Sequence, residues 1–134
     1  NAERHGVADR IGFWTADWLN LPPEALPPGG FDIIVSNPPY IPESRIDTLD
    51  RNVREYEPRI ALTAPGSDGL VFYRRLASEW EGKLRPGGSV LVEIGHDQHE
   101  AVVRIFTETG RFTHAGTYRD PSDPHNRVVH VRTG

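Results

Sequence analysis

The pattern of apolar and polar positions predicts an alternation of strands and helices along the chain. Short apolar runs rich in β-branched and aromatic residues are typical of strands. Five segments have this pattern, and the last two predict an antiparallel pair joined by a proline-containing loop: residues 10–16, 31–36, 89–94, 111–118 and 127–132. The run at residues 31–36 is mostly apolar and follows two glycines, which indicates a buried strand of a parallel sheet.

Two segments have helical spacing instead. The first lies between a capping residue, Ser67 or Asp68, and the turn Pro86-Gly87-Gly88. Its apolar residues recur every three or four positions: Leu70, Tyr73, Leu76, Trp80 and Leu84. A second helix is predicted over residues 98–109, where Gly110 stops it. Residues 41–66 predict irregular structure with one short helix near residues 49–55. The whole pattern predicts a three-layer α/β fold.

Composition narrows the class of protein. A length of 134 residues is that of one domain. The chain has no cysteine, which excludes a disulfide framework and a thiolate metal site. The net charge of −4 argues against a free-standing nucleic-acid binder, which would show a basic patch. No apolar run is long enough to cross a membrane and no signal-peptide pattern is present, so we expect a cytoplasmic protein.

The tetrapeptide Asn37-Pro38-Pro39-Tyr40 follows the predicted strand at residues 31–36 directly. Its two prolines end that strand. Because open α/β sheets bind ligands at the carboxyl ends of their strands, the tetrapeptide is expected in a binding site. Asn and Pro are also common turn residues, so an ordinary loop entry is the alternative explanation.

The tetrapeptide suits the methylation of a planar nitrogen. An amide or aryl amine is a poor nucleophile because its lone pair is delocalised, so it must be held and aimed by hydrogen-bond acceptors. The Asn37 side-chain oxygen and the Pro38 carbonyl can each accept one N–H. Both stabilise the positive charge that develops on nitrogen during attack. Tyr40 offers a flat surface for a planar target group.

Asn-Pro-Pro-Tyr resembles the signature of S-adenosylmethionine-dependent methyltransferases that act on planar nitrogens. These include N6-adenine methyltransferases and the glutamine-N5 methyltransferases of peptide-chain release factors. The chain is similar to the glutamine branch in several further segments: residues 53–62, Asp68-Gly69-Leu70, residues 84–88, Val92-Glu93-Ile94-Gly95 followed by Gln98, and Asp120 with Arg127-Val128-Val129. The resemblance runs almost end to end.

The resemblance implies a Rossmann-like methyltransferase sheet with helices on both faces, residues 31–36 as a central strand and an antiparallel terminal strand pair. The family's Gly-rich loop, and the acidic residue that ends its second strand, have no counterpart here. We therefore expect residues 1–134 to be the C-terminal portion of a single methyltransferase domain that lacks its first strands. Such a portion is expected to be inactive alone, and to self-associate through exposed apolar edges.

The resemblance also implies roles for residues outside the signature. Asp17 and Trp18 fall where the family contacts the adenine end of S-adenosylmethionine, and Asn37 is expected to lie beside this cofactor. A helix cap followed by a core aromatic is the alternative for this pair. With the signature residues, Glu57 is expected to shape the substrate pocket. Glu93 lies in an apolar strand, so it should end the strand near the pocket or have a partner.

The histidines allow a metal hypothesis. His96 and His99 are three positions apart, and imidazole suits zinc. Other potential ligands occur nearby and further on: Asp97, Gln98, His114, Asp120, Asp123 and His125. The first group starts a predicted helix, where Asp97 can be the N-cap, and most of the others lie in a loop. We therefore predict no metal site.

The predicted activity is methyl transfer from S-adenosylmethionine to a glutamine side-chain amide, with a release factor as the protein partner. Two alternatives stay open. The first is an N6-adenine methyltransferase, whose extruded base would stack on Tyr40. The second is a non-catalytic fragment that binds a partner without turnover.

Overall fold

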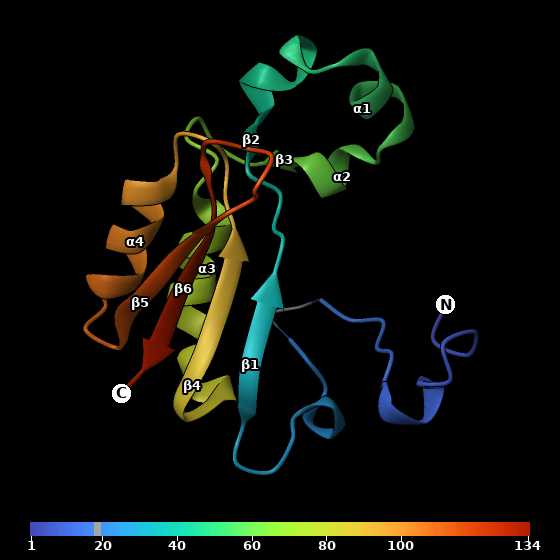
Figure 1. Cartoon of the computed structure of the whole chain (residues 1–134), viewed down its shortest axis with the longest axis vertical. Helices are drawn as coiled ribbons and strands as arrows, with labels where there is room; N and C mark the ends of the chain where they lie inside the picture. Colours follow the sequence, from blue (N-terminus) through green and yellow to red (C-terminus); the bar gives the residue numbers. More distant parts are fainter. Residues whose placement is uncertain (18–19) are drawn as a thin grey trace.

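A four-stranded mixed sheet forms the centre of the computed structural model, which describes residues 1–17 and 20–134. Its order is β1 (Phe31–Ser36), β4 (Leu84–Glu93), β6 (Asn126–Thr133) and β5 (Phe112–Arg119) (Figure 1). β1 and β4 are parallel, whereas β4–β6 and β5–β6 are antiparallel. The predicted α/β class and antiparallel terminal pair are confirmed, and β1 has the predicted bounds.

Two helices, α3 (Val71–Glu79) and α4 (His99–Thr107), cover one face of this sheet. They contact each other, and their apolar side chains form one core with alternate residues of the strands. The fully buried members are large: Tyr73, Leu76, Val90, Val92, Ile94, Val102, Phe106, Val129 and Val131. Burying one such side chain stabilises the fold by about 1.5–3 kcal/mol. The helical spacing seen in the sequence therefore marks the core-facing side of α3.

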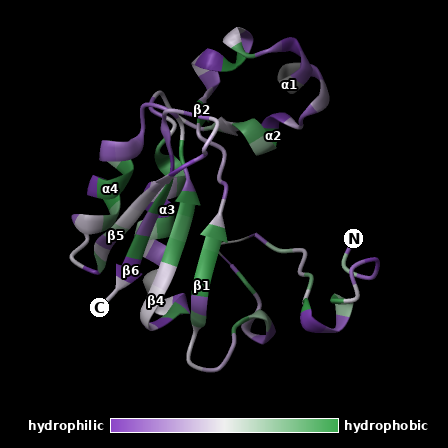
Figure 2. Ribbon diagram, viewed as in Figure 1, coloured by the Kyte–Doolittle hydropathy of each residue, from purple (hydrophilic) through white to green (hydrophobic). Residues whose placement is uncertain are grey.

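The opposite face of the sheet has no helix among the described residues. Side chains alternate between the two faces of a strand, so Ile33 and Val35 point away from buried Ile34. They are 59% and 76% exposed, whereas Ile34 is 7% exposed. Figure 2 shows the apolar residues along β1 and β4. The expected helices on both faces are therefore present on one face only in the described part.

The position of β1 also differs from the prediction. We expected a central strand, but β1 lies at the edge of the sheet. Residues 10–16 were predicted to be a strand but form none, and Phe13 and Trp14 in this segment are exposed. An apolar run becomes a strand only where a neighbouring strand supplies backbone partners. The described part of the chain supplies none on that side of β1.

The boundary between α3 and β4 was also predicted wrongly. Helical spacing extended to Leu84, but α3 ends at Glu79 and a short 3-10 turn, η4 (Glu81–Lys83), leads into β4 at Leu84. Pro86-Gly87-Gly88 lies inside β4, where the β1–β4 register shifts. A Cβ at Gly88 would lie 3.1 Å from the Phe31 carbonyl oxygen, so glycine permits this close approach.

The segment between β1 and α3 forms a small lobe beyond the strand ends (Figure 1). β2 (Ile41–Pro42) and β3 (Thr63–Ala64) pair in parallel and close its base. The lobe consists of one 3-10 turn and two short helices: η3 (Glu43–Thr48), α1 (Arg51–Tyr56) and α2 (Arg59–Leu62). α1 agrees with the short helix predicted here.

Among the residues described before β1, the chain forms the 3-10 turns η1 (Ala8–Arg10) and η2 (Pro23–Ala25). None of the described helices is long and apolar enough to span a bilayer.

Candidate functional site

The signature leaves the carboxyl end of β1, next to the carboxyl end of the parallel strand β4. Asn37 is exposed, Pro38 is buried, and Pro39 and Tyr40 are half-buried. Ser36, the last residue of β1, still pairs with Val92. The tetrapeptide therefore follows the end of an ordered strand, as predicted, and its chain runs from exposed Asn37 to buried Pro38.

A pocket of about 990 Å³ lies beside Tyr40, between the lobe, the start of α3 and the β4–α4 turn. Its lining includes aromatic, polar and charged side chains: Tyr40, Arg45, Asp68, His96, Gln98 and Arg127. Asn37 is not part of this lining. The pocket therefore adjoins the Tyr40 end of the signature.

Gln98 connects the walls of this pocket. Its side chain is 7% exposed. Its Nε2 donates to the Tyr40 carbonyl oxygen at 3.2 Å and to that of Asp68 at 3.4 Å. Its Oε1 accepts from the Gly95 N–H at 3.0 Å and lies 3.4 Å from the Tyr73 hydroxyl. The sequence alone indicated Gln98 as part of a family resemblance and as a potential metal ligand, but not as a residue of this pocket.

Tyr73 supports this amide from within the core. Its hydroxyl donates to the Glu93 backbone carbonyl at 2.9 Å. Burial raises the pKa of Tyr73, so the hydroxyl stays protonated and remains a donor. The buried polar groups around Gln98 are thus paired, which avoids the cost of about 1–3 kcal/mol for an unsatisfied group.

Two glycines allow the backbone at Tyr40 to pack closely. Gly69 has φ +68°, and a Cβ there would overlap the Tyr40 carbonyl oxygen. A Cβ at Gly95 would lie 3.3 Å from Cδ2 of the Tyr40 ring and closer still to the Gln98 amide. The pocket wall around Tyr40 therefore depends on residues without side chains.

Asp68 organises the start of α3, where sequence analysis expected a cap. Its carboxylate accepts from the Leu70 N–H at 3.0 Å and from Arg74 Nη2 at 2.6 Å. The formal N-cap is Leu70. The hydrogen bond from Arg74 is the main reason that the pKa of Asp68 is lowered.

Across the pocket, Arg45 pairs with Asp97 at 3.5 Å and joins the lobe to the β4–α4 turn. Both groups of that pair are exposed, so it adds little stability.

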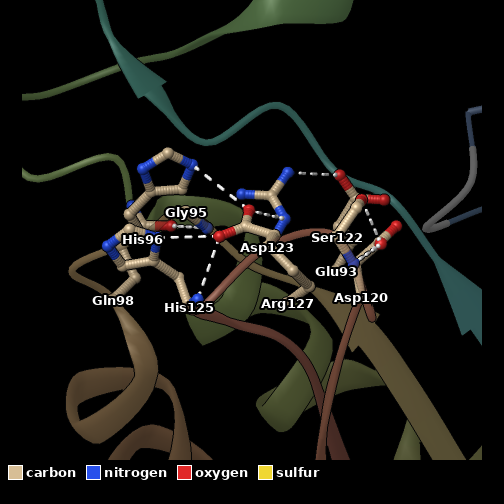
Figure 3. Close-up of polar contacts among 9 residues, drawn as sticks. All are labelled: Glu93, Gly95, His96, Gln98, Asp120, Ser122, Asp123, His125 and Arg127. Carbon is tan, nitrogen blue, oxygen red and sulfur yellow. Dashed lines mark hydrogen bonds and ion pairs between the residues drawn. The ribbon is translucent and has the colours of Figure 1, made fainter.

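Glu93 ends β4 and has a partner, as the sequence required. Its Oε1 lies 3.4 Å from Arg127 Nη2 (Figure 3). Arg127 Nε also lies 3.7 Å from Asp123, and Asp123 accepts from the His125 ring at 2.8 Å. Hydrogen bonds from the His125 backbone and ring hold the pKa of Asp123 below its usual value. These residues link the loop before β6 to the pocket.

The structure brings together three potential metal ligands that sequence analysis left apart. Donor atoms of His96, Asp123 and His125 lie within 4.8 Å of one another. The two rings, however, stack at 4.6 Å with 6° between their planes, so their nitrogen lone pairs lie in parallel planes and do not converge on a point. Asp123 is also engaged by Arg127. This arrangement is a stacked, ion-paired contact, and we assign it no metal.

The remaining predicted site residues lie elsewhere. Asp17 is exposed in the segment before β1, and its Oδ2 is 3.5 Å from Asn20 Nδ2. Trp18 lies outside the described residues. Glu57 is exposed between α1 and α2 and does not line the pocket. The structure therefore brings together the signature and the β4–α4 turn, but not Asp17 or Glu57.

Comparison with known proteins gives close relatives. A release factor glutamine methyltransferase of Geobacter sulfurreducens is 45% identical over 134 residues, which is 100% of this chain and 44% of the relative. That of Caulobacter vibrioides is 45% identical over 129 residues, 96% of this chain and 42% of the relative. The chain thus spans less than half the length of these relatives.

A solved methyltransferase from Pyrococcus furiosus matches 79% of this chain and 42% of its own length, with a TM-score of 0.53 and 19% identity. That likeness supports the methyltransferase fold alone. A scan against models of protein families finds no match. Along nearly all of its length the chain is similar to proteins named release factor glutamine methyltransferase, at 40–45% identity.

Proposed function

We propose that this chain is the C-terminal portion of an enzyme that transfers a methyl group from S-adenosylmethionine to the side-chain amide of a glutamine in a peptide-chain release factor. The observation that carries the proposal is the signature Asn37–Tyr40. It stands at the carboxyl end of β1 beside a pocket, in a chain 45% identical to relatives named for this activity.

The signature supplies acceptors for the target amide. Asn37 is exposed, so its side-chain oxygen is accessible to one N–H of the substrate. The Pro38 carbonyl is the second acceptor in this proposal. Two acceptors fix the orientation of the target nitrogen and stabilise the positive charge that develops on it. Tyr40, in the pocket wall, offers the aromatic surface against which the planar amide packs.

In this proposal the described residues supply only part of the site for S-adenosylmethionine. Asp17, expected to contact the cofactor's adenine end, is exposed in a segment that joins no strand. When bound, the cofactor supplies an electrophilic methyl group. In the proposed complete enzyme, most contacts to it come from outside this chain. We therefore expect the chain alone to bind the cofactor orders of magnitude more weakly, because several hydrogen bonds of about 1–3 kcal/mol each are lost.

The test is methyl transfer by the full-length protein to a release factor and, separately, to DNA and RNA. Asn37→Ala removes one acceptor and should cost roughly 2–4 kcal/mol of transition-state stabilisation, by analogy with the loss of one oxyanion-hole donor. Asn37→Asp keeps an acceptor and should retain part of the activity. Asn52→Ala, at an exposed position of α1, is the matched control and should retain the parental rate.

Each outcome has a distinct meaning. Methylation of adenine rather than glutamine would replace the proposed substrate by the alternative one. No methylation of any acceptor by the full-length protein would favour a non-catalytic binding role. A parental rate in both Asn37 variants would show that the residue is only part of a loop.

A further inference from the structure

The partners of the Gln98 carboxamide fix which way it points. Its nitrogen faces the carbonyl oxygens of Tyr40, Asp68 and Gly69, which can only accept. Its oxygen faces the N–H of Gly95, which can only donate. If the amide were flipped, the Gln98 side-chain oxygen would face three backbone carbonyl oxygens in a buried site, which would raise the free energy of the folded state. Gln98 therefore has one orientation, and in that orientation it holds the Tyr40 carbonyl.

This contact anchors the far end of the signature. Its near end is fixed because Ser36 pairs with Val92 in the sheet. Between these anchors lie two prolines, whose rings fix φ near −65° and leave the backbone few alternatives. With both ends held, the directions of the Asn37 side chain and the Pro38 carbonyl are determined by the sheet, by the β2–β3 pairing that begins at Ile41 and by one buried amide.

We propose that Gln98 is a positioning residue of the methyltransferase, whose amide holds the signature so that its two acceptors face a common point. This inference rests on the proposed function, and it assigns Gln98 a role in turnover without contact to the substrate. A displacement of about 1 Å at reacting groups can lower a rate about 100-fold. Gln98 should therefore affect kcat more than it affects binding.

The decisive variant is Gln98→Glu in the full-length enzyme, since it keeps the shape and removes the N–H donors that face the carbonyls. We expect kcat to fall about 100-fold, while KM for the release factor and the cofactor Kd change little. Glu100→Gln is the matched control, because it makes the reverse exchange at an exposed position of α4 that does not line the pocket. It should keep kcat within about threefold.

The proposal is overturned if the folded Gln98→Glu enzyme keeps the parental kcat. Should that variant fail to fold, Gly69→Ala displaces the same carbonyl by steric overlap. It should show the same loss of kcat, and full kcat in folded Gly69→Ala enzyme would equally overturn the proposal.

A readout without turnover separates this proposal from the proposed function. Tyr40-Ile41 is the only Tyr-Ile pair in this sequence. Labelling tyrosine carbonyl carbons with ¹³C and isoleucine nitrogens with ¹⁵N therefore gives the Tyr40 carbonyl an NMR signal that no other residue of this sequence gives. Its resonance should move in Gln98→Glu and stay in place in Glu100→Gln. An unmoved resonance contradicts the contact with Gln98, whereas a wild-type enzyme that does not methylate the release factor contradicts the proposed function.

Discussion

The two faces of the sheet both carry β-branched residues along β1 but differ in what covers them. On the face under α3 and α4, Val90, Val92 and Val129 are almost completely buried. On the other face, Ile33 and Val35 are mostly exposed, although Ile34 between them in the same strand is buried. Ile33 and Val35 are as apolar as the buried valines, so their burial depends on the elements that pack against each face. An apolar pattern therefore identifies side chains that can be buried, and the packing of helices decides which of them are buried in this chain.

The largest expected effect tests the covered face. Phe106→Ala removes a fully buried ring that packs edge-on against Phe112 at 5.4 Å. It should lower the free energy of unfolding by about 3–5 kcal/mol, measured by urea denaturation followed by circular dichroism. Ile33→Ala is the matched change on the open face and should lower the free energy of unfolding by at most about 1 kcal/mol. Equal losses in the two variants would remove the distinction between the faces.

An intermediate effect is expected for association. The chain alone exposes apolar side chains next to the unpaired edge of β1, a combination that favours self-association. Val35→Lys places a charge on this surface and should shift the chain toward monomer in sedimentation velocity. Tyr56→Lys changes an equally exposed residue of α1, away from the sheet, and should leave association unchanged. A wild-type chain that is monomeric at high concentration would contradict the expectation.

The smallest expected effect is on the pH dependence of stability, and it concerns His130. This residue lies half-buried on the open face between Tyr118 and Ser89. Burial, with a further contribution from Arg132, lowers its pKa below the ordinary 6.5. The unfolded chain therefore takes up a proton at higher pH than the folded chain. Stability contributed by neutral His130 is present above pH 6.5 and is lost as the pH falls through the folded pKa.

His130→Gln should therefore flatten the decline of stability below pH 6.5, measured as denaturation midpoints across pH. His5→Gln, at an exposed histidine near the amino end, is the control and should leave the decline as it is. Identical pH profiles for wild type and His130→Gln would show that this histidine titrates alike in both states.

Local patterns predicted those elements whose partners are near in sequence or whose ends are marked by proline or glycine. β1 has its predicted bounds because two prolines follow it, and α4 ends near Gly110. The strand predicted over residues 10–16 is absent because strand formation needs a neighbouring strand. The helix predicted up to Leu84 was too long because that residue fits helical spacing but pairs with Phe31 across the sheet.

The candidate site was predictable to a similar degree. The position of Asn37–Tyr40 at a strand end followed from the apolar run before it. The role of Gln98 did not, because its partners at Tyr40 and Asp68 are 58 and 30 positions away and contribute backbone atoms. Side-chain patterns carry no information on where a distant carbonyl points. A buried glutamine at the start of a helix can be recognised only when the fold brings its acceptors together.

The edge position of β1 has a consequence for the order of folding. β5 and β6 are close in sequence, with Arg119 and Asn126 only 7 positions apart, so their hairpin closes a short loop. β1 meets β4 only after a much longer loop closes, which costs more chain entropy and slows pairing. Because none of the described residues pairs with its outer edge, β1 is also the strand of this sheet whose separation breaks the fewest contacts. Partial unfolding of this chain should therefore release the Asn37–Tyr40 segment while the helix-covered core persists.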